Sequence, residues 1–179
     1  MTSKVGNVPL DADPLVWAFV HYWQRIRPSG RLPGRAHLDP IEIPKLLPNI
    51  RLLDVLDDGP FRYRVRLIGT ECVHHLGYDP TGSWYENITS AFRGSIVERD
   101  LKQVCTTRRP VYRRGRTLVP YVTEATQIER VHLPFAKDGH NVDLIASLTL
   151  FDREKPRFDN LTSSTANADG DRGRIAASA

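Results

Sequence analysis

An alternation of apolar and basic residues over 61–68 constrains the fold more than any other feature of this sequence. The segment reads FRYRVRLI, with arginine at every second position from Arg62 to Arg66. Successive side chains of a β-strand point to opposite sides, whereas a helix would scatter these residues around its axis. The alternation therefore predicts a strand with one buried face and one face that is solvated or paired.

A second strand precedes this one, and a tight turn joins the two. Residues 50–56 read IRLLDVL, and DDGP at 57–60 separates them from the alternating segment. A short stretch of Asp, Gly and Pro between two apolar strands is typical of an antiparallel hairpin.

A helix with an aromatic face is predicted near the N-terminus, because Asp13-Pro14 combines a capping residue with a proline suited to the first turn. Its apolar stripe recurs at the helical period and consists of Leu15, Phe19, Tyr22, Trp23 and Ile26. The helix also carries more aromatic surface than a short helix usually hides in its own domain, namely Trp17, Phe19, Tyr22 and Trp23. We therefore predict a homodimer that forms through this helix.

The remaining elements complete an α+β pattern. After a turn-rich connector at 28–37, we expect a short irregular helix near 41–47, a short helix at 71–76, a helix at 91–107 that Ser90 caps, and strands at 111–118, 126–135 and 142–151. With the hairpin, this gives a sheet of five strands.

The chain of 179 residues suits one domain, because a single core usually serves about 100–200 residues. We expect a flexible N-terminus at 1–12, one domain at 13–152 and a disordered tail at 153–179, where few apolar residues remain. No apolar run approaches the roughly 20 residues of a membrane span, and no signal-peptide pattern opens the chain. A cytoplasmic location is expected.

The order of these elements is that of PAS domains, and the sequence resembles a bacterial family of short PAS-like proteins. The residues that carry the resemblance over about 14–151 are the Trp-bearing first helix, Asp39-Pro40, Leu46-Leu47-Pro48, RLIGT at 66–70, Gly77 with Asp79-x-Thr81-Gly82, and Leu133-Pro134-Phe135 with Asp138-Gly139. The resemblance implies a five-stranded antiparallel sheet with helices packed on one face and an N-terminal helix. It also implies signal sensing or protein interaction, and it transfers no catalytic or ligand residues.

A small-molecule pocket is expected between the inner face of the sheet and the segment 70–90, which Gly77, Pro80 and Gly82 interrupt. The candidate ligand-binding residues are Tyr63, His74, Tyr78, Trp84 and His132. An apolar wall with a few polar tips suits a small, partly apolar, non-covalent ligand. A filled core, in which these aromatic residues pack on one another, is an equally open alternative.

Catalytic and metal motifs are missing from the sequence. It contains no Gly-x-Ser-x-Gly, no His-Glu-x-x-His and no phosphate-binding glycine-rich loop. The adjacent His74 and His75 would point in different directions on a helix, and the thiols of Cys72 and Cys105 form no metal-binding pair. We expect a protein that is not an enzyme, binds no metal at these residues and has a cofactor, if any, that the sequence does not name.

Nucleic-acid binding by a basic α+β domain is the alternative function. The arginines at 108–109 and 113–116 flank Tyr112, a combination able to hold phosphates and stack a base. However, 25 basic residues are interleaved with 21 acidic ones, and a charged sheet edge explains the same cluster. We predict no specific nucleic-acid binding. Because no output domain is recognisable, a signal would pass to a protein partner.

Overall fold

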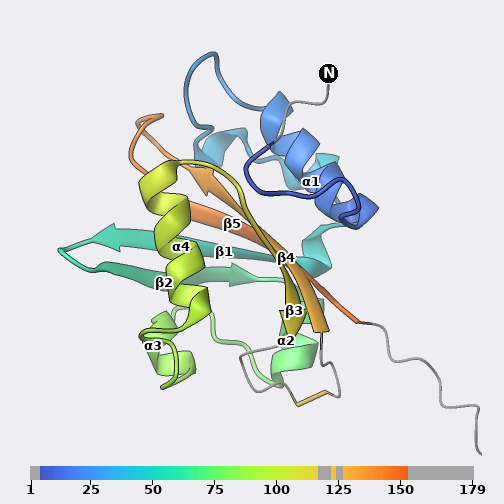
Figure 1. The fold of residues 1–179 in the computed structure, drawn as a ribbon, viewed down its shortest axis with the longest axis vertical. Helices are drawn as coiled ribbons and strands as arrows, with labels where there is room; N and C mark the ends of the chain where they lie inside the picture. The colour runs from blue at the N-terminus through green and yellow to red at the C-terminus, as the bar shows by residue number, and fades with distance from the viewer. Residues whose placement is uncertain (1–4, 117–121, 124–126, 153–179) are drawn as a thin grey trace, which may run out of the picture.

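A five-stranded antiparallel sheet forms the centre of the molecule in the computed structural model, which describes residues 5–116, 122–123 and 127–152 (Figure 1). The strands lie in the order β2-β1-β5-β4-β3. Their bounds are β1 Ile50–Asp57, β2 Phe61–Ile68, β3 Val111–Arg116, β4 Gln127–Phe135 and β5 Leu144–Phe151. This confirms the predicted α+β fold with five strands.

The β1–β2 hairpin places its two sets of side chains on opposite faces, as the alternation predicted. Tyr63 and Val65 are fully buried, whereas Arg64 and Arg66 are exposed. The pairing register shifts between Leu52 and Leu53, and both arginines reach one carboxylate, that of Asp54, at 3.2 and 2.5 Å. The charges of Arg64 and Arg66 are therefore paired within the hairpin, while Arg62 pairs with Glu86 at 3.0 Å.

Helix α1, Pro14–Arg25, covers one face of the sheet, which we call the outer face. The carboxylate of Asp13 caps it by accepting a hydrogen bond from the amide of Leu15 at 2.8 Å. Phe19 and Trp23 are fully buried among residues of β4 and β5, and the Trp23 indole donates to the carbonyl of Pro134 at 2.8 Å. The helix and the outer face thus share one apolar core.

Most of the aromatic residues that suggested self-association are buried in the core of the chain itself. Phe19, Tyr22 and Trp23 are buried in the outer-face core. Trp17 is partly exposed and donates its indole N–H to the carbonyl of Pro9 at 3.2 Å. The homodimer stays a prediction, but these three side chains do not provide an exposed apolar face for it.

Residues 5–12 lie against the sheet edge, although the sequence suggested a flexible N-terminus. The side chain of Asn7 pairs with the backbone of Tyr112 in β3, donating to its carbonyl at 2.9 Å and accepting from its amide at 2.6 Å. Val8 and Ala12 are buried. The contacts cover part of an edge strand, which reduces its capacity to pair with another sheet.

The opposite face, which we call the inner face, carries the other helices. They are α2 Thr70–Leu76, α3 Tyr85–Ile88 and α4 Ile96–Thr107, and α4 crosses the strands (Figure 1). The irregular helix expected near 41–47 is instead a pair of 3-10 turns, Pro40–Glu42 and Leu47–Asn49, with a further turn at Arg35–His37. Pro44 and Pro48 exclude a continuous helix there, because proline lacks the amide that a helix interior needs.

Helix α4 begins five residues later than predicted, and Ser90 is not its cap. The hydroxyl of Ser95 accepts a hydrogen bond from the amide of Glu98 at 3.2 Å. Gly94, with φ of 76°, adopts a left-handed conformation that ends any earlier helical turn. Phe92 still packs in the inner core from the preceding turn.

Candidate ligand-binding site

Aromatic side chains fill the inner face near the hairpin. The ring of Phe92 lies 4.7 Å from that of Tyr85 and 6.0 Å from that of Tyr63, between ring centroids. Leu101 and Val104 of α4 complete the cluster, and both are fully buried. In this region the inner face is a packed core, which corresponds to the filled-core alternative.

Polar side chains replace this apolar packing at the other end of the inner face. We call the set of Arg51, Arg130, His132, Ser147 and Thr149 the polar row. Strand pairing places Ser147 between Arg51 and His132, and Thr149 opposite Arg130. All five are buried, so this face of the sheet holds two buried arginines.

Hydrogen bonds within and around the polar row fix its geometry. The Nδ1 atom of His132 lies 2.7 Å from the hydroxyl of Ser147, and Nε of Arg130 donates to the hydroxyl of Thr149 at 2.8 Å. Nη1 of Arg51 donates to the hydroxyl of Tyr85, on α3, at 3.0 Å. Bonds of this kind offset the cost of burying polar groups.

An ion pair fastens α4 to the sheet beside the polar row. Two guanidinium nitrogens of Arg113, on β3, donate to the carboxylate of Asp100 on α4, and the Nη2–Oδ1 distance is 2.5 Å. Asp100 is 4% exposed. Its carboxylate raises the pKa of Arg113, so the guanidinium stays protonated in this contact.

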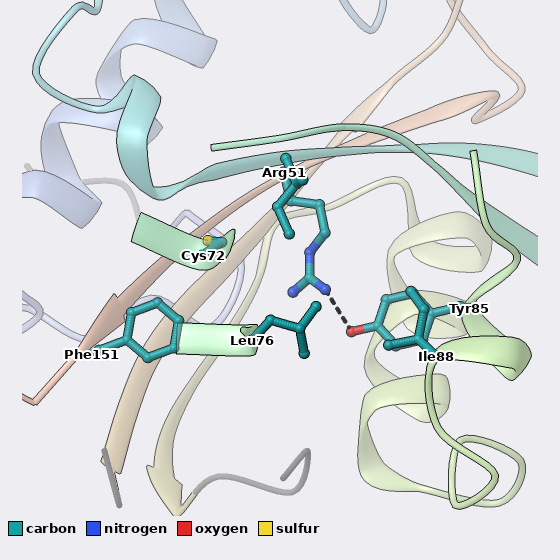
Figure 2. A pocket seen from close by; sticks show the side chains of 7 residues that line it. Arg51, Cys72, Leu76, Tyr85, Ile88 and Phe151 are labelled. Carbon is teal, nitrogen blue, oxygen red and sulfur yellow. Dashed lines mark hydrogen bonds between the residues drawn. The ribbon is translucent and has the colours of Figure 1, made fainter. Parts of the chain in front are cut away.

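A small cavity lies where α2 and α3 meet the ends of β1, β2 and β5 (Figure 2). Its lining residues are Arg51, Ile68, Cys72, Leu76, Tyr85, Ile88 and Phe151. Its volume of about 10 Å³ corresponds to roughly one water molecule. In Figure 2 the Arg51 guanidinium projects into this space, with Leu76 and Ile88 near it.

Nearby arginines shift the pKa values of two groups in this region, Cys72 and His132. Burial raises the pKa of the Cys72 thiol, while the charges of Arg51 and Arg130 lower it by a smaller amount. Burial also lowers the pKa of His132 well below 6.5, and the positive charges of Arg130, Arg51 and Arg113 lower it further. Both groups therefore experience a positive potential from these arginines.

The structure does not bring together the five residues predicted from the sequence. Tyr63 lies in the aromatic cluster, and His132 lies in the polar row. His74 and Tyr78 are exposed, and Trp84 lies at the edge of β2 with its ring centroid 3.9 Å from the guanidinium of Arg62. None of the five is among the described residues that line the cavity.

The polar residues of the cavity wall, Arg51 and Tyr85, were not predicted from the sequence. A signal for Arg51 was present, because in IRLLDVL it shares its strand face with Leu53 and Val55. A charged residue in line with two core positions indicates a buried arginine. Tyr85 directly follows Trp84 in the sequence. Of these two adjacent aromatic residues, Tyr85 is the one whose ring is buried in the inner core.

Among the described residues, no group of three or more His, Cys, Asp or Glu side chains is arranged to hold a metal ion. Cys72 and Cys105 are buried and form no disulfide. Within the same ranges, no helix combines the length and apolar character needed to cross a membrane.

The burial of His132 predicts that acid destabilises the protein. Its folded-state pKa lies below the unfolded value of about 6.5, so the unfolded chain takes up the proton first as pH falls. Relative to His132→Asn, the wild type should lose about 1.4 kcal/mol of unfolding free energy between pH 7.5 and 5.5. Urea unfolding at both pH values measures this difference. Parallel pH dependence of the two proteins would contradict the assignment.

A family model described as PAS domain matches residues 13–149. The matched region runs from the cap of α1 into β5, and so includes every described residue that lines the cavity except Phe151. No curated protein matches the chain.

Proposed function

The chain belongs to the PAS domain family, a family of sensory and signalling modules, and from this premise we propose that it is a non-catalytic sensor of a small molecule. The ligand would bind at the cavity between the polar row and helices α2 and α3. Its binding would alter association with a protein partner, which is either a second copy of this chain or another protein.

The observation that carries this proposal is the mixed lining of the cavity. Arg51 and Tyr85 present polar atoms to a space whose other walls include Ile68, Leu76 and Ile88. Small-ligand sites combine an apolar wall with a few polar groups that fix orientation. Tyr85 also packs against Phe92 of the aromatic cluster, so its ring belongs to the inner core while its hydroxyl meets Arg51 at the cavity.

The helices around the cavity are the shortest on the inner face, which favours an adjustable site. Helix α2 has seven residues and α3 has four, whereas α4 has 12. Short helices depend on tertiary packing for their stability, so an occupant that displaces Leu76 or Ile88 would move α2 or α3. Such a movement would change the surface that a partner contacts.

A thermal-shift screen tests the proposal with variants that block or spare the cavity. Ile88→Trp should fill the space beside Arg51, while Leu67→Trp adds the same side chain at an exposed position. A metabolite that binds the native cavity, at a free concentration of 100 times its Kd, adds about 2.7 kcal/mol to the free energy of unfolding. This raises the Tm by several degrees. We expect such compounds to raise the Tm of wild type and Leu67→Trp but not of Ile88→Trp. If no compound stabilises the wild type, the module binds proteins only.

Nucleic-acid binding is less well supported, because much of the basic cluster has acidic partners. Arg113 pairs with Asp100, and Arg114 pairs with Asp11 and Glu129 at 2.9 and 3.2 Å. We predict that binding to mixed DNA or RNA is weak and disappears by about 0.2 M salt, as expected for phosphate contacts alone. Fluorescence anisotropy with labelled oligonucleotides measures it. Sequence-dependent binding that survives this salt would restore the alternative.

A further inference from the structure

We propose that the free edge of β3 is a docking site for an extended acidic segment of a partner protein, which adds a strand to the sheet. Residues 5–12, which we call the N-terminal strap, cover part of this edge in the free protein and compete with the partner. The proposal goes beyond the small-molecule site, because it requires no ligand in the cavity. Three features lead to it: the backbone of β3, the contacts of the strap and the charge around the edge.

Strand β3 lies at the edge of the sheet, so one side of its backbone has no neighbouring strand among the described residues. Tyr112 directs its amide and carbonyl to that side, because both bond to Asn7 rather than to β4. Outward-facing groups recur at every second residue of an antiparallel edge strand, so Arg114 presents its amide and carbonyl to the same side. An extended peptide that adds to a sheet edge bonds to groups of this kind.

The N-terminal strap covers this edge without forming a strand. Asn7 uses its side chain, not its backbone, to pair with the backbone of Tyr112 at 2.9 and 2.6 Å. Gly6, with φ of 61°, approaches Pro110 so closely that a Cβ at this position would collide with the Pro110 carbonyl oxygen. A partner strand therefore reaches Tyr112 only after Asn7 has left it.

The charge around the edge favours an acidic partner. Arg114 already binds an acidic residue of the strap, donating to the carboxylate of Asp11 at 2.9 Å and to its carbonyl at 2.7 Å. Arg108, Arg109 and Arg116 are exposed and form no ion pair within the described part of the chain. A second copy of β3 would place arginines opposite arginines, which is unfavourable. An acidic segment places carboxylates there instead.

Burial of the strap makes it an effective competitor. Val8 is 4% exposed and packs in the outer-face core, so the strap stays on the sheet in the free protein. The apparent affinity for a partner is reduced by the small fraction of molecules in which Asn7 has left Tyr112. Changes that loosen the strap should therefore strengthen binding of the partner.

Titrations of the full-length protein with three synthetic peptides, followed by ¹H–¹⁵N NMR, test the proposal. The first peptide alternates valine with glutamate over about eight residues, a usual strand length. The second has lysine in place of glutamate, and the third keeps glutamate but carries N-methyl groups on alternate backbone amides. We expect the first to shift the amides of β3 and the side-chain amide of Asn7. It should bind at least about tenfold more tightly than the other two, which lack either the charge or the backbone donors.

Asn7→Ala combined with Asp11→Ala loosens the strap, so the valine–glutamate peptide should bind this variant about tenfold more tightly than the wild type. Unchanged affinity would contradict the competition. If the double variant does not fold, the side-chain amide of Asn7 in the wild type decides the same question. Its resonances should move as the peptide binds, and peptide binding that leaves them unchanged would overturn the role of the strap.

A second pair of substitutions tests the charge without touching the strap. Arg109→Gln combined with Arg116→Gln should weaken binding of the valine–glutamate peptide about three- to tenfold. Lys45→Gln combined with Lys137→Gln is the matched control, because it removes two exposed cations outside β3 and α4, and it should leave the affinity unchanged. Equal weakening in both variants would show that only net charge matters, which contradicts a site at the β3 edge.

The remaining outcomes separate strand addition from general binding of anions. Equal binding of the N-methylated peptide would show a charge contact without strand pairing. A single-stranded oligonucleotide that binds as tightly as the peptide at about 0.2 M salt would show a surface for polyanions. Either result contradicts the proposal. If no peptide binds, the docking site is wrong, and the metabolite screen decides the proposed function separately.

Discussion

Replacing Trp23 by alanine should lower the free energy of unfolding by about 3–5 kcal/mol, the usual cost of emptying a large buried aromatic site. Trp23 is 1% exposed, packs between α1 and the outer face of the sheet, and donates a buried hydrogen bond to Pro134. The substitution removes the ring and leaves that carbonyl without its donor. Urea unfolding measures the loss, and a two-state transition with an unchanged m-value would attribute it to the native state.

Trp17→Ala is the matched control, because it removes the same side chain from the same helix. Trp17 is only partly buried and donates to Pro9 at 3.2 Å, so its loss should cost about 1 kcal/mol. If Trp23→Ala instead dissociates a dimer and leaves the unfolding free energy unchanged, α1 is mainly an oligomer contact. Sedimentation velocity on wild type and both variants distinguishes these outcomes.

Arg113→Met should cost about 3 kcal/mol, because it leaves the carboxylate of Asp100 buried without its cation. Breaking a buried pair by removing one partner usually costs about 3–5 kcal/mol. The Arg113 side chain is 33% exposed, and solvent screening places the expected loss at the lower end of that range. Chemical denaturation of wild type and variant gives the value directly.

Two further variants measure how much the ion pair between Arg113 and Asp100 contributes to stability. Arg114→Met makes the same change on the next residue, whose side chain is 44% exposed and whose partners are Asp11 and Glu129. Asp11 is exposed and Glu129 keeps the hydrogen bond from the Asp13 amide, so this change should cost less than about 1 kcal/mol. Asp100→Leu combined with Arg113→Met removes both charges, so it should be more stable than Arg113→Met alone. If the double variant is as unstable as the sum of its single variants, the buried charge is not the cause.

The parts of the fold that the sequence predicted well depend on local periodicity. The alternation correctly predicted the buried face of β2 at Tyr63 and Val65, because successive side chains of a regular strand point to opposite faces. It failed at Leu67, which is exposed because the register shift in the hairpin breaks the alternation there. The cap at Asp13 likewise located the start of α1. The predicted start of α4 was wrong, because the cap is Ser95 and not Ser90. Gly94 lies between the two serines in a left-handed conformation, so the helix can begin only after it.

The candidate site was harder to predict, because it forms only when distant segments meet. Arg51 and Tyr85 are 34 residues apart and are joined by one hydrogen bond. Trp84, chosen from the sequence, has an extended backbone, forms an isolated bridge with Arg64, and so lies at the sheet edge. Tyr85 begins α3 and turns inward. Periodicity does not reveal which of two adjacent aromatic residues enters a helix.

The most direct test of the sensor proposal is to map, by ¹H–¹⁵N NMR, where a stabilising metabolite from the screen binds on the wild-type protein. We predict that the largest amide shifts fall in Thr70–Leu76, Tyr85–Ile88 and the adjoining ends of β1 and β5, around the cavity of Figure 2. The same compound should leave the spectrum of Ile88→Trp unchanged. Shifts confined to α1 or to the turn of the β1–β2 hairpin, or equal shifts in Ile88→Trp, would contradict a ligand site between the polar row and the two short helices.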